Sequence, residues 1–162
     1  MLFCRNSDNV RGIAGWQRDL SVSHYNVGVL LLAQGDKGAA LKEHQAALAI
    51  TERLAQTDPK NALWQRDLGP RYHRGGQILK NQDKDKLARE FFGKGAQSYA
   101  GLASSMGDFY NAACCYALMG DKDQAFAALG KAVERAVDDI GMPVGLDKGV
   151  AGKCHIGVSF HI

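Results

Sequence analysis

The chain has 162 residues, of which 46% are apolar and 23% are charged, and its formal net charge is +3. This composition is typical of a folded globular protein and argues against a largely disordered chain. The longest apolar run, residues 27–33, is too short to cross a bilayer, and residues 1–6 have no apolar core of signal-peptide length. We therefore expect a cytoplasmic protein with no membrane association, whose cysteines are reduced thiols.

The first predicted elements are two helices joined by a tight turn. Residues 1–15 show no clear periodicity, and we expect an irregular lead-in there. From Trp16 onward, apolar residues recur at spacings of three, four and seven, which predicts a helix. Gly35-Asp36 should end it, because Gly adopts the left-handed conformation found at helix ends and Asp can cap the next helix. That second helix should end before Thr57-Asp58-Pro59, since the residue before a proline avoids helical dihedral angles.

The third predicted helix carries an internal repeat. The pentapeptide Trp-Gln-Arg-Asp-Leu at residues 16–20 returns at residues 64–68, 48 positions later, which is typical of a stacked repeat array. Asn61 can cap this helix. Gly69-Pro70 predicts a kink or a break, because a proline inside a helix costs about 3 kcal/mol, and Gly75-Gly76 should weaken the helix further. A fourth helix is expected over residues 84–104.

The remaining sequence predicts one more helix pair and a tail. Met106-Gly107-Asp108 indicates a stop and a cap, and helices are expected over residues 109–119 and 122–137 with Gly120-Asp121 between them. Residues 138–162 contain five Gly and one Pro and no helical stripe, so we expect an irregular Gly-rich tail.

The predicted fold is therefore all-α, with about three helix-turn-helix units stacked into an α-α superhelix. The repeat domain spans residues 16–137, divided into units of about 16–57, 61–104 and 108–137. Measured between the turn residues Gly35, Asp83 and Gly120, the period is 48 and then 37.

Two stretches carry a family resemblance. In each stretch, small residues stand at the positions where the two helices of a tetratricopeptide repeat touch, and larger residues stand between them. Both stretches therefore resemble that family, and the Trp-Gln-Arg-Asp-Leu segments resemble its bacterial arrays, in which such repeats are often attached to signalling or effector domains. The two stretches are Asn26-Val27-Gly28-x-x-Leu31-x-x-x-Gly35-Asp36-x-x-x-Ala40-x-x-x-His44-x-x-Ala47-Leu48 and Asn111-Ala112-Ala113-x-x-Tyr116-x-x-x-Gly120-Asp121-x-x-x-Ala125-x-x-x-Leu129-x-x-Ala132.

The resemblance implies a protein-interaction scaffold that binds a peptide or partner segment along its concave groove. Tyr, Asn and Arg side chains in that groove would offer contact area, hydrogen bonds to an extended backbone, and a clamp for a carboxylate. His44 departs from the aromatic residue usual at its position, and we interpret it as a partly buried neutral histidine. Some members of the family grip the C-terminal carboxylate of chaperones with Lys and Asn side chains at fixed groove positions. Those positions hold other residues here, so we do not expect a chaperone partner. The implied groove residues are Tyr25, Asn26, Val29, His73, Arg74, Gln77, Tyr110, Asn111 and Cys114.

Several other functions are weighed against this one. The sequence has no nucleophile elbow, HExxH motif or phosphate-cradling Gly loop, so we expect no enzyme, cofactor or metal site. Residues 60–96 hold nine Lys/Arg against four Asp/Glu, and this basic band gives a weak case for nucleic-acid binding. A regulatory or oligomerisation module cut from a larger signalling protein remains an alternative. The outer apolar face of the last helix needs cover, which the Gly-rich tail, a second copy of the chain or a neighbouring domain would supply, so a homo-oligomer is also a prediction.

Overall fold

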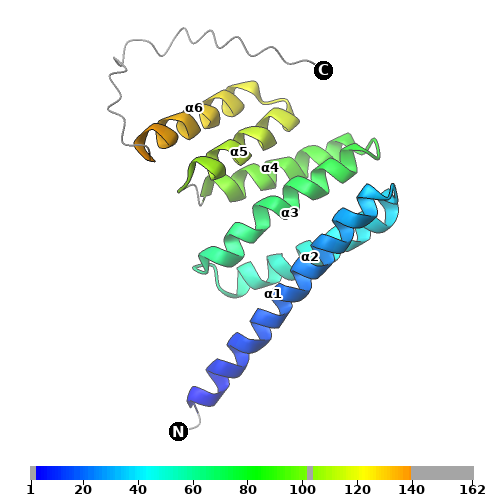
Figure 1. The fold of residues 1–162 in the computed structure, drawn as a ribbon, viewed down its shortest axis with the longest axis vertical. Helices are drawn as coiled ribbons and strands as arrows, with labels where there is room; N and C mark the ends of the chain where they lie inside the picture. Colours follow the sequence, from blue (N-terminus) through cyan, green and yellow to red (C-terminus); the bar gives the residue numbers. More distant parts are fainter. Residues whose placement is uncertain (1–2, 102–103, 140–162) are drawn as a thin grey trace.

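The computed structural model describes residues 3–101 and 104–139 of the chain. Within these residues the protein consists of six helices packed in consecutive pairs, which confirms the predicted all-α, repeat-like fold (Figure 1). The expected irregular tail lies outside the described residues from residue 140 onward. No described helix is long and apolar enough to span a membrane. The helices are α1 (Phe3–Ala33), α2 (Lys37–Thr57), α3 (Ala62–Lys80), α4 (Asp85–Gly101), α5 (Met106–Met119) and α6 (Lys122–Asp139).

The turns inside the three pairs share one backbone feature. Gly35 and Gly120 have φ angles of 86° and 85°, in the left-handed region that ends helices. Asp83 occupies the equivalent position between α3 and α4 and takes φ of 58° without being glycine. Asp is one of the few residues that tolerate this conformation. The turn position inferred from the sequence is therefore the same in all three pairs.

Helix ends carry the capping residues that their sequences suggest, with one difference. The side chains of Asp36 and Asn61 accept hydrogen bonds from the first-turn backbone of α2 and α3. For α5, however, the N-cap is Ser105 and not Asp108. Asp108 instead accepts from the Ser105 backbone in a reciprocal capping box, so α5 begins at Met106, ahead of the predicted start.

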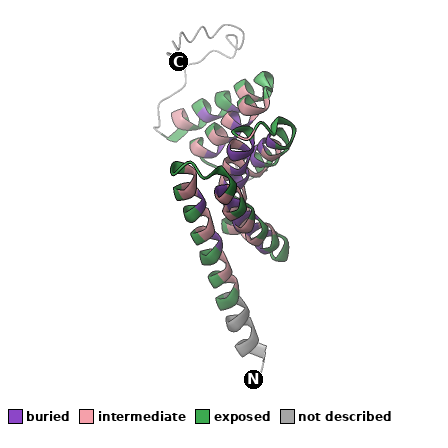
Figure 2. Cartoon of the chain, turned by 90° about the vertical axis from the view of Figure 1, so that its right-hand side faces the viewer, coloured by how far each residue is buried: buried purple, intermediate pink, exposed green. Residues whose placement is uncertain are grey.

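The helix α1 is longer than the sequence predicted. Residues 3–15 were expected to be irregular, but they belong to α1, whose N-terminal part extends beyond the other helices (Figures 1 and 2). No proline interrupts this stretch. A side chain added at Gly12 or Gly15 would meet nothing within 4 Å, so these glycines serve no close contact. They lower helix propensity by about 1 kcal/mol each but give no stop signal.

A kink or a break was predicted near Gly69, and the break is wrong, because the helix α3 runs continuously through Pro70. Proline lacks the N–H that would bond the Arg66 carbonyl one turn earlier, so α3 loses one backbone hydrogen bond there. Packing holds the helix, because its glycines receive aromatic rings of α4. A Cβ placed on Gly69 or Gly76 would lie within 2.8 Å of the ring of Tyr99 or Phe92 respectively. These glycines are therefore sites of close helix contact.

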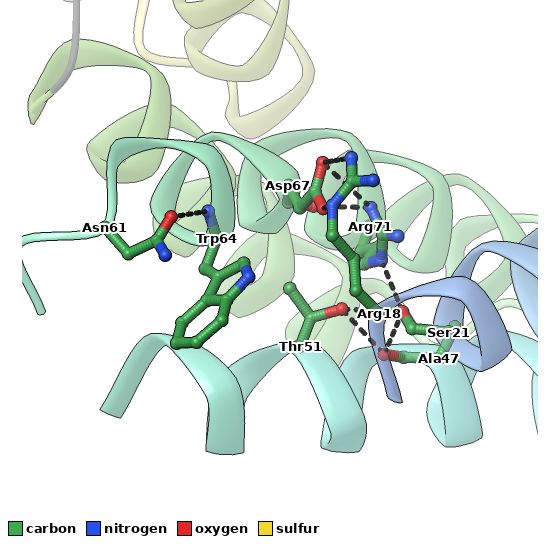
Figure 3. Close-up of polar contacts among 8 residues, drawn as sticks. All are labelled: Arg18, Ser21, Ala47, Thr51, Asn61, Trp64, Asp67 and Arg71. Atoms are coloured by element: carbon green, nitrogen blue, oxygen red, sulfur yellow. Dashed lines mark hydrogen bonds and ion pairs between the residues drawn. The ribbon is translucent and has the colours of Figure 1, made fainter. Parts of the chain in front are cut away.

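The first and second units meet through a buried polar network (Figure 3). Arg71, only 5% exposed, donates from Nε to Ser21 Oγ at 3.0 Å. Ser21 Oγ in turn donates to the Ala47 carbonyl of α2. Asp67 of α3 pairs with Arg18 of α1 at 2.8 Å and lies 3.9 Å from Arg71. Side chains of α1 and α3 and a backbone carbonyl of α2 thus fix the position of the second unit on the first.

The second and third units meet through apolar contacts. Tyr99 and Ala96 of α4 form one buried cluster with small residues of α5 and α6. Small side chains let helices approach closely and bury a continuous core along a stacked array. The remaining members of this cluster are Ala112, Ala113, Cys115 and Ala128.

Candidate peptide-binding site

A pocket of about 160 Å³ lies where α1, α3 and α4 meet. Its residues come from three helices: one tyrosine from α1, four side chains from one face of α3, and a second tyrosine from α4. Positions 70, 73, 74 and 77 share that face because their spacing of three and four residues matches the helical period. The lining residues are Tyr25, Pro70, His73, Arg74, Gln77 and Tyr99.

A chain of hydrogen bonds orders the polar side chains of the pocket. Arg74 donates to Gln77 Oε1 at 2.9 Å. The Gln77 amide nitrogen lies 3.0 Å from His73 Nε2, which makes Nε2 the acceptor and assigns the ring proton to Nδ1. Burial lowers the pKa of His73, and the nearby Arg74 charge lowers it further, so the ring is neutral at pH 7. The pocket therefore holds one cation, a neutral imidazole and an amide in fixed positions.

His73 also faces a thiol on its other side. Its Nδ1 lies 3.5 Å from Sγ of Cys115, a residue of α5 that is fully buried. A Cys–His contact can signal a nucleophile, but only when the thiolate is favoured. Here burial raises the pKa of Cys115 to about 12, with a smaller contribution from Cys114. The thiol is thus protonated at neutral pH and acts as a weak acceptor for the His73 N–H, which links the pocket to the third unit.

A second arginine, Arg71, lies behind the Tyr25 wall of the pocket and adds to the positive charge of Arg74. The Arg71 guanidinium lies 5.6 Å from the centre of the Tyr25 ring, in cation–π contact. On another side the Tyr25 ring meets His44 edge-on, with ring centres 5.2 Å apart. His44 is buried, as the sequence suggested, although more completely than expected at 2% exposed. Tyr25 is held between these two groups and is pre-positioned as a wall of the pocket.

Residues 109–137 match the tetratricopeptide repeat family. These residues cover most of α5 and α6. Comparison with curated proteins gives no match. A tetratricopeptide repeat indicates a protein–protein interaction module, and the family is typically not catalytic.

The tetratricopeptide repeat of α5 and α6 shows the expected packing of small residues. Ala113 and Ala132 are buried at 6% and 3% exposure, and Ala125 is half-buried. These are the positions where the two helices were expected to touch. The equivalent small residues of the first unit, Gly28 and Ala40, are buried as well. The packing rule of the repeat thus extends beyond the residues that match the family.

The predicted groove residues divide into two groups. Tyr25, His73, Arg74 and Gln77 line the pocket. The other five lie outside it: Asn26 and Tyr110 are exposed, and the remaining three are half-buried. The three half-buried residues are Val29, Asn111 and Cys114.

Sequence reasoning missed two lining residues, Pro70 and Tyr99. The signal for Pro70 was present, because it lies one helical turn before Arg74 on the same face. From the sequence alone, however, Pro70 is interpreted only as a helix breaker. Tyr99 belongs to a second helix of a pair, which the resemblance assigns to the outer side. Its ring passes Gly69, where the absence of a side chain leaves room for it to reach the pocket.

Among the described residues, no group of three or more His, Cys, Asp or Glu side chains is arranged to hold a metal ion.

Proposed function

We propose that the protein is an interaction scaffold that binds a peptide segment, with a carboxylate of that peptide seated beside Arg74. The observation that supports this most directly is the meeting of four predicted groove side chains, from two units, in one pocket. A volume of about 160 Å³ is below the roughly 300 Å³ at which small-molecule sites begin, so the pocket suits a single side chain or chain end.

The charge of the pocket selects the chemistry of the ligand. None of its six lining residues is acidic, and Arg74 lies in its wall with Arg71 behind Tyr25. Arg74 donates one hydrogen bond to Gln77, and its planar guanidinium has further N–H groups that could bind a carboxylate. Tyr25 and Tyr99 add aromatic area with polar tips. An acidic side chain or a C-terminal carboxylate is thus the expected anchor, and Tyr110 and Asn111 would contact the peptide further along the array.

The proposal is tested by fluorescence polarisation against a peptide library in which each Asp- or Glu-containing peptide has an Asn- or Gln-containing match. We expect acidic peptides to be selected and Arg74→Gln to weaken their binding about 10- to 100-fold, since a charge-assisted hydrogen bond contributes about 1.5–3 kcal/mol. Amidated peptide ends distinguish a C-terminal carboxylate from a side chain.

The matched control is Arg66→Gln, which removes an exposed arginine from the same helix and should leave binding unchanged. Tyr25→Ala should weaken capture and Tyr110→Ala should weaken it less. Selected peptides that bind Arg74→Gln as tightly as the wild-type protein would refute the proposed anchor.

A second candidate function, that of an oligomerisation module within a larger bacterial signalling protein, is favoured by the exposed apolar residues at both ends of the array. We also infer a cytoplasmic location, which is supported by the free thiols of Cys114 and Cys115.

A further inference from the structure

The first helix carries an exposed apolar row. Trp16, Leu20 and Leu30 of α1 are 74%, 51% and 63% exposed. Large apolar side chains that share one helix face and contact solvent often mark an interaction surface. We call Trp16, Leu20 and Leu30 the N-terminal face.

The internal repeat allows a comparison with the equivalent residues of α3, which are covered by the rest of the protein. The 48-residue offset places Trp16 opposite Trp64 and Leu30 opposite Ile78. Ile78 is fully buried and Trp64 is half-buried. Both α1 and α3 are paired with the helix that follows them, so the difference comes from the unit that precedes α3. That preceding unit supplies α2, toward which the Trp64 ring points in Figure 3.

Contacts between α3 and α2 describe this covered state. Gln65 of α3 donates to the Ala55 carbonyl at 2.9 Å, and the Tyr72 hydroxyl bonds Glu52. The last helix, α6, is the equivalent of α2 in the third unit. When the sequence is aligned on the two Gly-Asp turns, with Gly35 opposite Gly120, Leu48 falls opposite Val133. Leu48 is 7% exposed and Val133 is 51% exposed.

A second residue of α6 is also exposed although its counterpart in α2 is covered. The same sequence alignment places Leu41 opposite Phe126. Leu41 packs against the buried cluster of Leu79 and Phe92, whereas Phe126 is 71% exposed. We call Phe126 and Val133 the C-terminal face. Each end of the array therefore presents the half of a contact whose complete form occurs between the first and second units.

We propose that a second copy of this chain covers these faces, with the N-terminal face of one molecule packed on the C-terminal face of the next. The interface continues the stacking already present inside the chain, and one molecule carries both of its halves. Such a head-to-tail contact joins two different surfaces, so it does not close into a two-fold dimer and adds further molecules in the same direction. This inference is independent of the peptide pocket, whose residues belong to neither face.

The test uses two variants of the full chain, Trp16→Glu/Leu30→Glu and Phe126→Glu/Val133→Glu, each of which disables one face. The control Gln45→Glu/Gln97→Glu adds two negative charges at exposed positions outside both faces. Masses are measured by light scattering after size-exclusion chromatography, and circular dichroism checks that all variants fold. Because the replaced side chains are exposed, folding should be retained.

We expect the wild-type and control proteins to increase in mass with concentration beyond that of a dimer. Each single-face variant should remain a monomer alone, and an equimolar mixture of the two should form a dimer and nothing larger, because one intact pair of faces remains. A wild-type protein that is monomeric at every concentration would overturn the proposal, and would indicate that another segment or partner covers the faces. Persistent dimers of either variant alone would also overturn it, because they indicate a two-fold interface.

Discussion

At the scale of single residues, Asp67 is the counter-ion for two guanidinium groups. It contacts Arg18 at 2.8 Å and Arg71 at 3.9 Å, and Arg71 is buried. Breaking a buried ion pair by removing one partner leaves an uncompensated charge and is strongly destabilising, whereas exposed pairs contribute little. The second copy of the repeated pentapeptide thus uses its aspartate structurally. Asp19, the equivalent residue in the first copy, is exposed.

We expect Asp67→Asn to lower the free energy of unfolding by about 3 kcal/mol, because it removes the counter-charge of the buried Arg71. Asp19→Asn is the matched control and should change stability by less than about 0.5 kcal/mol. Urea denaturation followed by circular dichroism measures both. Equal effects of the two substitutions would show that the buried network does not depend on the Asp67 charge.

His44 is the second residue with a measurable signature. Its two ring nitrogens are buried, and neither has a hydrogen-bond partner among the described residues. Burial lowers its pKa from 6.5 to about 4, and the Arg74 and Arg71 charges add to this effect while Glu43 opposes it. The folded protein therefore keeps this ring neutral where the unfolded chain would protonate it.

Because the folded pKa lies below the unfolded value, the unfolded state binds the proton first as the pH falls. Stability should be unaffected by His44 well above pH 6.5 and should decrease as the pH falls from 6.5 to 4, by roughly 3 kcal/mol at pH 4. The variant His44→Leu, which takes the residue found at the equivalent position 129, should lose less stability over this range. Thermal melts at a series of pH values test this, and identical slopes for both proteins would contradict it.

At the scale of helices, glycines in α3 act as notches for aromatic rings of α4. Sequence reasoning identified these glycines but interpreted them as weak points, because helix propensity describes an isolated helix and not a packed one. The same limit explains Pro70, whose local cost was predicted and whose compensation by the packing of α3 against α4 was not. Turns and caps were predictable, because Gly, Asp and Asn act on the backbone next to them.

Gly76→Ala should destabilise the protein by about 1–3 kcal/mol, because its Cβ would lie 2.7 Å from a ring atom of the fully buried Phe92. The matched control is Gly130→Ala in α6, where a new Cβ meets nothing within 4 Å. That substitution should stabilise the protein by about 0.5–1 kcal/mol through helix propensity alone. Chemical denaturation should therefore show shifts of opposite sign, and a stabilising Gly76→Ala would exclude the notch interpretation.

At the scale of the whole molecule, the pairwise helix order followed from the repeat, since each pair must bury its apolar face against a neighbour. The candidate site was only partly predictable. Positions 73, 74 and 77 share a helix face by period alone, whereas the contribution of Tyr99 depends on how α4 rotates against α3. Contacts such as Arg71 with Ser21 join residues 50 positions apart and depend on the stacking geometry, which no local pattern encodes.

The junction between the first and second units adds a buried ionic network to its apolar contacts, whereas the junction between the second and third units is mainly apolar, so the two should differ in their response to temperature. The apolar contacts between the second and third units weaken on cooling, because hydrophobic association loses strength at low temperature. The ionic and polar contacts between the first and second units have a desolvation cost that falls on heating. Cooling should therefore weaken the attachment of the C-terminal pair of helices more than the attachment of the N-terminal pair.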